Sequence, residues 1–153
     1  ANIDLRLGIE HKDRNGWLVH QGDGVFTTFK ATQWEPNFDA SWFITPQQQL
    51  KLSLQWIGVR AKGEQRYGIT DSGHLQRQIG DAREDDFSLS DMVVQLRYKW
   101  EMAPLSDLFI VYSRGGNDSF DDRERSNSNL FKTLYTDPDK EQLIFKVRYR
   151  FGS

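Results

Sequence analysis

The chain has 153 residues, with 20 basic and 22 acidic side chains and no cysteine. This length allows one domain with a core or one small barrel, and the near-zero net charge argues against a nucleic-acid partner. No apolar run approaches the roughly 18 to 20 residues of a membrane-spanning helix, so a helical span is excluded. The low mean hydropathy does not exclude a membrane barrel, because lipid-facing and lumen-facing residues alternate along its strands and average out.

Residues 2–11 predict the first β-strand. Apolar side chains occupy every second position of this stretch, with polar residues or glycine between them, and a period of two is the period of a strand. Residues 12–16 are polar and end in Asn-Gly, which favours a hairpin turn before extended structure resumes at Trp17. The Gly-Asp-Gly segment at 22–24 indicates a further turn or a bulge.

The middle of the chain predicts a hairpin followed by a long loop. Residues 34–44 and 50–56 alternate apolar with polar side chains, and the segment 45–49 between them reads as a short turn. Residues 61–86 are polar and rich in Gly, Arg, Gln and Asp. We therefore predict a long loop there, and loops of that length are usually functional or mobile.

The last third of the chain contains the two strongest strand patterns, residues 90–102 and 143–151. The first is as long as the roughly 9 to 11 residues that a tilted membrane strand needs. Between them we predict a tight turn at 103–107, a strand at 108–112 and a second long loop at 115–141, with an extended piece at 130–135.

The last strand ends on Phe151, which Gly152 and Ser153 follow. A final alternating strand that closes on an aromatic residue resembles the insertion signal read by the outer-membrane barrel assembly machinery. This resemblance favours a membrane barrel over a soluble one.

Together these elements predict an all-β, antiparallel up-and-down transmembrane β-barrel of about 8 strands. The short turns at Pro46 and Pro104 alternate with the long loops near 61–86 and 115–141, as periplasmic turns alternate with extracellular loops in outer-membrane barrels. If residues 12–16 form a turn, the chain has about seven strands. Ala1 then lies at the end of the barrel that carries the long loops. Since complete barrels have even strand counts, residues 1–153 are either one barrel domain with a hidden strand or the C-terminal part of a larger outer-membrane barrel.

The same alternation divides the side chains of such a barrel into two sets. Outer-membrane barrels turn apolar residues toward lipid and polar ones toward the lumen, with aromatic girdles at both interfaces. We predict that charged side chains face the lumen, where they form a paired plug or line a conduit for anionic solutes. These charges are Arg6, Lys51, Arg97, Lys99, Lys146, Arg148, Arg150, Asp4, Glu10, Asp91 and Glu101. The residues predicted to face the membrane or to form girdles are Trp34, Trp42, Trp56, Tyr98, Trp100, Tyr149 and Phe151.

Several stretches resemble a known family. Residues 50–61, 87–90, 95–101 and 104–116, with Lys-Asp-Arg at 12–14, are similar in order and spacing to the end of a family of uncharacterised bacterial outer-membrane proteins. Its members carry an N-terminal carbohydrate-binding module of the family-nine type and a C-terminal barrel of unassigned function. The resemblance implies a location in the bacterial outer membrane. It also implies that lipid and the assembly machinery are partners, that early strands and the carbohydrate-binding module lie outside this chain, and that there is no catalytic residue to carry over.

Other chemistry is weakly represented in the sequence. His11, His20 and His74 lack metal-ligand spacing, and the acidic stretches 81–86 and 117–122 lack the spaced pattern of a calcium loop. No nucleophile elbow, Walker loop or dinucleotide fingerprint occurs. We therefore predict no cofactor, no metal and no enzyme activity.

The expected function is an outer-membrane anchor or conduit associated with surface carbohydrate handling. One alternative is a soluble β-barrel that binds a small apolar ligand in its lumen, with Leu5, Leu54, Leu96 and Val147 facing inward. A weaker alternative is an outer-membrane hydrolase with a loop-borne site.

Overall fold

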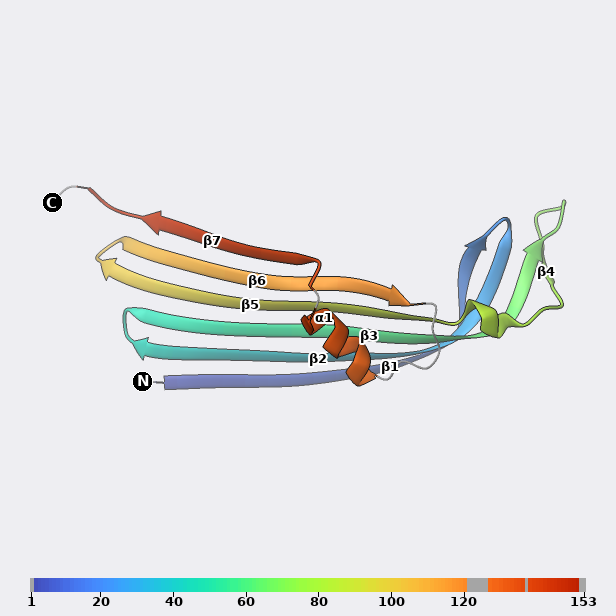
Figure 1. Ribbon diagram of the computed structural model, residues 1–153, viewed down its shortest axis with the longest axis horizontal. Coiled ribbons are helices and arrows are strands. Elements are labelled where there is room, and N and C mark those ends of the chain that lie inside the picture. Colours follow the sequence, from blue (N-terminus) through green and yellow to red (C-terminus); the bar gives the residue numbers. More distant parts are fainter. Residues whose placement is uncertain (1, 121–126, 137, 152–153) are drawn as a thin grey trace.

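The computed structural model describes residues 2–120, 127–136 and 138–151. Its strands form one antiparallel sheet in the order β1-β2-β3-β5-β6-β7, with the short strand β4 paired to the last residues of β3 (Figure 1). The elements are β1 (Asn2–Gly22), β2 (Val25–Thr45), β3 (Gln48–Ile69), β4 (Leu75–Arg77), the 3₁₀-helix η1 (Ala82–Asp85), β5 (Phe87–Ala103), β6 (Ser106–Phe120), α1 (Asn127–Thr136) and β7 (Lys140–Arg148).

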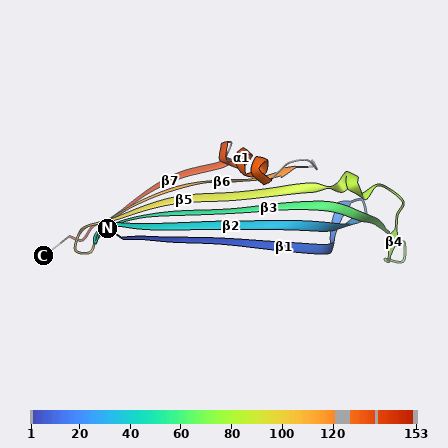
Figure 2. The ribbon, with the colours of Figure 1, turned by 90° about the horizontal axis from the view of Figure 1, so that it is seen from below.

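The predicted all-β, antiparallel class is confirmed, whereas closure into a barrel is not observed. Within the described residues β1 pairs only with β2, and β7 pairs only with β6, so the sheet of seven strands is open. Viewed from below, the strands form one layer with α1 on one side of it (Figure 2). Two sheet edges and much of both faces therefore remain uncovered.

The first strand is longer than predicted, because residues 12–16 are not a turn. Residues 15 and 16 lie at a register shift between two regular stretches of β1–β2 pairing. Gly16 has a φ of +70°, which glycine adopts without strain, so one extra residue is accommodated there as a β-bulge. The hairpin turn lies instead at Asp23-Gly24, where both residues have positive φ, as one of the two readings of 22–24 predicted.

The short turns predicted at Pro46 and Pro104 share one end of the sheet, as predicted, whereas the turn at Asp23-Gly24 lies at the opposite end (Figure 1). Pro46-Gln47 joins β2 to β3, and Pro104-Leu105 joins β5 to β6. We call this end the short-turn end and the opposite one the long-loop end. β1 starts and β7 ends at the short-turn end (Figure 1). The prediction that β1 starts at the long-loop end is wrong, because the bulge at 15–16 removes one turn from the count.

The connection predicted as a loop at 61–86 contains regular structure. β3 continues to Ile69, and residues 75–77 form β4 beside it. The prediction relied on polar composition, but the extension of β3 pairs with β2 and β4, and whether a segment forms a strand depends on such cross-strand context. The remaining connection holds η1, which packs back onto β3.

The second connection, predicted as a loop at 115–141, also differs. β6 continues to Phe120, and α1 occupies Asn127–Thr136, where an extended piece was predicted at 130–135. Apolar residue types at 130, 131, 134 and 135 recur with the spacing of a helix, which explains the error. The parts of this prediction at 121–126 and 137 lie outside the described residues.

Few side chains are buried in this single layer. The largest fully buried ones are Phe29, at 0% exposure, and Met92, at 1%. They lie in two small separate clusters. Since a sheet normally buries at least one face against a second layer, the two open faces are the candidate functional surfaces.

Candidate functional site

Cross-strand register assigns every paired residue to one of two faces, because directly opposed side chains point to the same side of a sheet. Face 1 is defined here as the side that carries Ile3, Trp42 and Leu50, which lie in one register row. Face 2 is the side that carries Asp4 and Lys51 in the adjacent row. The two faces differ sharply in composition toward the short-turn end.

Face 1 carries a continuous apolar band across all six long strands. Its residues follow one another from strand to strand through the register, and the charged residues Arg114 and Glu141 border it on β6 and β7. The apolar band consists of Ile3, Leu5, Leu7, Ile9, Trp34, Pro36, Phe38, Ala40, Trp42, Leu50, Leu52, Leu54, Trp56, Met92, Val94, Leu96, Tyr98, Trp100, Leu108, Ile110, Tyr112, Leu143, Phe145 and Val147.

Much of the apolar band is open to its surroundings. Leu7 on β1 is 73% exposed and Phe145 on β7 is 64% exposed. Scattered exposed apolar side chains are ordinary, but a contiguous patch over six strands is far larger than a soluble monomer usually shows. The band is therefore a surface that needs an apolar partner.

The edge of the band toward the long-loop end is oblique, whereas at the opposite edge Trp100, Leu108 and Val147 lie in one register row. The oblique edge lies at Trp34 on β2 and at Leu143 on β7. Leu143 lies in the same register row as Ala40 of β2, because each residue of that row is paired with the next across the sheet. Ala40 is six residues from Trp34, which is about 20 Å along a strand, whereas the strand spacings from β2 to β7 add up to about 19 Å. This edge is therefore inclined by roughly 45° to the direction of the interstrand hydrogen bonds.

Aromatic residues mark both edges of the band. Near the long-loop end, the Trp34 ring lies 4.3 Å from the His11 ring between centroids. The Trp56 indole lies over Gly58, where a Cβ atom would come within 2.5 Å of the ring, and its N–H donates to Ser90 Oγ at 2.8 Å. The aromatic residues of the opposite edge are Trp42, Tyr98 and Trp100.

Five of the predicted girdle residues thus share face 1. The other two, Tyr149 and Phe151, follow the end of β7, because the last strand, Lys140–Arg148, begins and ends three residues earlier than the predicted 143–151. Their rings contact each other edge to face, with centroids 4.9 Å apart.

The charges predicted to line a lumen also share one face, which is face 2. The register places every predicted member there except Arg150, which follows β7 and donates its backbone N–H to Ser106 Oγ at 3.2 Å. The shared members are Asp4, Arg6, Glu10, Lys51, Asp91, Arg97, Lys99, Glu101, Lys146 and Arg148.

Ion pairing on face 2 is uneven. On β1 and β2, Lys12 Nζ lies 3.1 Å from Glu10 and 3.4 Å from Glu35, and Arg6 lies 3.3 Å from Asp4. On β5 to β7, the nearly buried carboxylate of Asp107 binds Arg148, and Lys99 lies 4.0 Å from the same carboxylate. On face 2, acidic residues outnumber basic ones on β1 and β2, and basic residues outnumber acidic ones on β3 to β7.

Beyond the band, toward the long-loop end, the polarity of the two faces is exchanged. Phe29, Ala31 and Ala61 are buried on face 2, where Trp17, Val19, Val59 and Phe87 pack around them. Face 1 carries polar and charged residues at the same level, namely Thr32, Arg60, Ser88, Ser90 and Asp118. The same sheet therefore buries face 2 in one half and exposes apolar residues on face 1 in the other.

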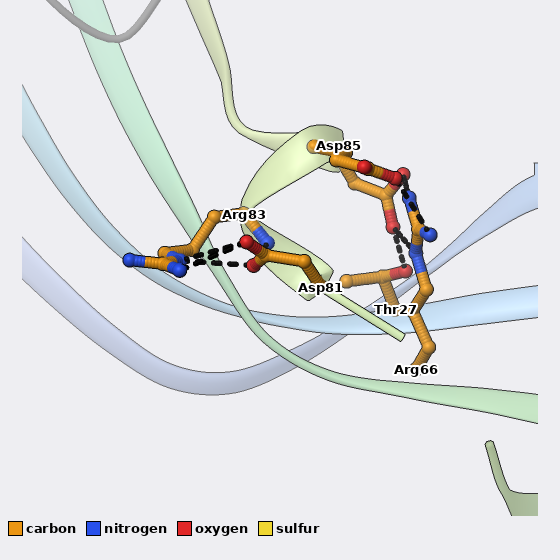
Figure 3. A network of polar contacts seen from close by, with 6 residues as sticks. Thr27, Arg66, Asp81, Arg83 and Asp85 are labelled. Atoms are coloured by element: carbon orange, nitrogen blue, oxygen red, sulfur yellow. Dashed lines mark hydrogen bonds and ion pairs between the residues drawn. The ribbon is translucent and has the colours of Figure 1, made fainter. Parts of the chain in front are cut away.

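The 3₁₀-helix η1 covers the buried half of face 2 and is held there by a polar clamp (Figure 3). Arg66 of β3 binds Asp85 through two guanidinium nitrogens, with Nε 2.6 Å from Asp85 Oδ2, and Thr27 of β2 donates its hydroxyl to the same oxygen at 2.5 Å. The Arg66 hydrogen bond, together with that of Thr27, lowers the pKa of Asp85 despite its burial. The clamp therefore ties three elements together through one ionised carboxylate.

Two further contacts hold η1 close to the sheet. Asp86 accepts a hydrogen bond from the backbone N–H of Gly63 at 2.7 Å. A Cβ atom at Gly63 would overlap the carbonyl oxygen of Ala82, so only glycine permits this approach. Asp81 caps η1 by accepting from the backbone N–H of Arg83 at 2.9 Å.

Helix α1 lies on face 1, at the long-loop edge of the apolar band. Its Phe131 ring contacts the Trp56 ring edge to face, with centroids 5.9 Å apart, and packs against the cluster of Trp56 and Met92. α1 and η1 thus cover opposite faces of the sheet. No helix among the described residues is both long and apolar enough to cross a membrane.

The histidines do not form a metal centre. The His11 ring lies against that of Trp34 at a tilt of 43°, and the ring of His20 lies 4.8 Å from that of Phe26. Within residues 2–120, 127–136 and 138–151, no three His, Asp or Glu side chains come together in a way that could hold a metal ion.

The fold and its two faces define an all-β protein with an open antiparallel sheet. The chain matches a protein-family profile over residues 2–151, and it belongs to that family, which is described as a domain of unknown function (DUF5916). No curated protein and no solved structure matches the chain.

Proposed function

We propose that this sheet is part of the wall of a transmembrane β-barrel in a bacterial outer membrane. In this proposal the apolar band of face 1 contacts the lipid hydrocarbon, and the charges of face 2 line the lumen. The role is that of a membrane anchor and conduit rather than of an enzyme. The observation that carries the proposal is the exposed, uncharged band of face 1 with aromatic residues at both edges.

The dimensions of the band support this assignment. The band spans nine residues on β2 (Trp34 to Trp42) and on β5 (Met92 to Trp100), and five residues on β6 and on β7. A tilted membrane strand needs about 9 to 11 residues, so the width on β2 and β5 fits a membrane span. The band edge is inclined by roughly 45° to the interstrand hydrogen bonds, and the strands of outer-membrane barrels are tilted by about 35–45°. A membrane plane drawn through tilted strands would produce this oblique boundary.

The exchange of polarity between the faces argues for the membrane barrel over the soluble alternative. A soluble barrel with Leu5, Leu54, Leu96 and Val147 inward would need face 1 to be its interior along the whole strand. Phe29 and its neighbours are buried on face 2 instead. In a membrane barrel the strands that project beyond the lipid meet water on their outer face, so their apolar residues turn inward, as they do here.

The two open edges are consistent with a larger barrel. β1 and β7 each present one edge of backbone N–H and C=O groups with no strand beside it within the described residues, and such groups must be paired inside a bilayer. Additional strands, lipid and the barrel assembly machinery are the partners we propose. The association with a carbohydrate-binding module and surface carbohydrate rests on the family resemblance alone.

A first experiment tests for a membrane barrel as a whole. Urea-unfolded protein is diluted into detergent micelles or into plain buffer, and boiled and unboiled samples are compared on a denaturing gel. We expect a heat-dependent mobility shift only after dilution into detergent. A soluble monomer that unfolds cooperatively in plain buffer would contradict the proposal.

A second experiment tests the two faces separately. Because the chain has no cysteine, single substitutions Leu5→Cys and Arg6→Cys can each carry one bimane fluorophore in protein reconstituted into phospholipid vesicles. We expect nitroxide-labelled lipid to quench bimane at position 5, and aqueous iodide to quench it at position 6. As a control beyond the band, bimane at Leu18→Cys should be quenched by iodide and not by lipid. Equal quenching at positions 5 and 6 by either agent would refute the facing.

A further inference from the structure

We propose that face 2, near the short-turn end, binds organic anions that carry several carboxylate or phosphate groups on an apolar frame. Its placement inside a lumen rests on the proposed function, whereas the binding itself rests on the residues alone. The site consists of a cation cluster, defined as Lys51, Arg97, Lys99 and Lys146, around an apolar floor of Phe109 and Val111.

The register brings these cations together from three strands. Lys51 of β3 is directly opposite Arg97 of β5. Phe109 of β6 is directly opposite both Lys99 of β5 and Lys146 of β7. Opposed side chains in an antiparallel pair have Cβ atoms about 5 Å apart, and like charges at that spacing destabilise the sheet. An anion seated between the cations would remove this repulsion.

The cations of the cluster are poorly neutralised by the protein. Among the described residues, no carboxylate lies within 4.0 Å of Lys51, Arg97 or Lys146, and Lys99 reaches only Asp107, at 4.0 Å. That carboxylate is already bound by Arg148. Lys12, on the same face, has two carboxylates within 3.4 Å. Face 2 thus pairs its cations near β1 and leaves them uncompensated near β5.

The floor between the cations is apolar and concave. Lys99 Nζ lies 5.9 Å from the centroid of the Phe109 ring, which remains half-buried. A hollow of about 450 Å³ lies over the floor, which is within the range of small-molecule sites. Its lining residues are Gln49, Lys51, Gln95, Arg97, Tyr98, Lys99, Phe109 and Val111. Cations around an aromatic ring favour a planar or apolar frame with acidic groups at its edge.

The probe for this site is benzene-1,3,5-tricarboxylate, which has a planar ring and three acidic groups. Its affinity for the whole chain folded in zwitterionic detergent is measured by titration calorimetry. The double variant Lys51→Gln/Arg97→Gln should bind at least about 10-fold more weakly than the wild type, because two charge-assisted contacts are lost. The control Lys12→Gln/Lys140→Gln removes the same charge from face 2 outside the cluster and should leave affinity unchanged.

Two outcomes of this comparison would refute anion binding at the cation cluster. One is a wild-type protein that binds no benzene tricarboxylate. The other is a control that loses as much affinity as the double variant, since binding would then follow net charge and not the cluster.

The apolar floor is tested with Phe109→Ala. This variant should lose affinity for benzene tricarboxylate while keeping its affinity for citrate, which has the same number of carboxylates and no ring. An unchanged affinity for both anions, or an equal loss for both, would refute the proposal that the anion's ring contacts Phe109.

Insertion of the same variants, followed by the heat-dependent gel shift, separates this inference from the proposed function. Variants that insert normally and lose the anion support the site. A wild-type chain that binds the anion and does not insert would refute the membrane barrel and leave the binding site standing.

Discussion

Arg66 of β3 holds the carboxylate of Asp85 in η1, with the Arg66 Nε atom 2.6 Å from Asp85 Oδ2, across 19 residues of chain. Both side chains are largely shielded from solvent, at 21% and 13% exposure. This contact fixes the connection between β3 and β5 over the apolar cluster of face 2. The clamp therefore holds η1 against the half of face 2 that carries the buried cluster.

We expect Asp85→Ala to release η1 without unfolding the sheet. The substitution leaves Arg66 and Thr27 without their shared acceptor, which costs about 1–3 kcal/mol for partly buried groups. Cleavage by trypsin after Arg83 measures this opening, because its rate follows the population of the open form. Asp71→Ala, which removes an exposed carboxylate from the same connection, is the control and should leave the cleavage rate unchanged.

The clamp should also weaken in acid. The hydrogen bond from Arg66 lowers the pKa of Asp85 in the folded state below its unfolded value of about 3.9. The Asp85 contribution is therefore fully present above about pH 4 and is lost as pH falls through the lower folded pKa. The protection factors of the Arg83 and Asp86 amides in hydrogen exchange should stay constant at pH 5 to 8. They should decrease at pH values below about 4, because the clamp opens more often there. In Asp85→Asn this acid-dependent step should be absent.

We expect a positive charge to be tolerated on face 2 of β7 but not on face 1. Val147 and Ile144 are both β-branched and exposed, at 61% and 43%, and they point to opposite faces. In the proposed barrel, Val147→Arg would place a charge in lipid at a cost of about 2–4 kcal/mol near the midplane, whereas Ile144→Arg would face water. The folded fraction in vesicles, read from the unboiled band on a gel, checks this. Equal loss for both variants would contradict the assignment of the faces.

Gly63→Ala should displace η1, because the new Cβ atom would overlap the backbone carbonyl of Ala82. We expect a loss of about 1–3 kcal/mol in the stability of this region, as for other overpacked sites. Gly80→Ala is the matched control, since its Cβ atom would meet only Arg66 side-chain atoms, at 3.6 Å and beyond. Faster tryptic cleavage after Arg83 in Gly63→Ala and not in Gly80→Ala is the expected result.

The strand patterns near the short-turn end were readable from local sequence alone. Alternation at 2–11, 50–56 and 90–102 predicted strands that the structure contains, and Pro46 and Pro104 marked the turns between them. The division of the predicted charges and aromatics between two faces followed from the same alternation, because side chains on a strand alternate strictly. The turns are short and local, so their residues suffice to specify them.

The long-loop half could not be predicted in this way. Strand extensions at 61–69 and 115–120 depend on pairing with residues far away in the chain, and their polar composition resembles that of a loop. Helix α1 packs Phe131 on Trp56, a contact between distant segments. The apolar cluster on face 2 is likewise assembled from four strands and is invisible to local patterns.

The faces on which Ile9 and Trp17 lie could not both be predicted from the local sequence. Both are apolar and occupy odd positions of one strand, and by alternation alone they share a face. In the structure Ile9 lies on face 1 and Trp17 on face 2, because the bulge at 15–16 inserts one residue and reverses the alternation. The sequence by itself determined that one apolar and one polar face exist. Pairing with β2 decided where they exchange, since a one-residue shift in register moves every later side chain to the opposite face.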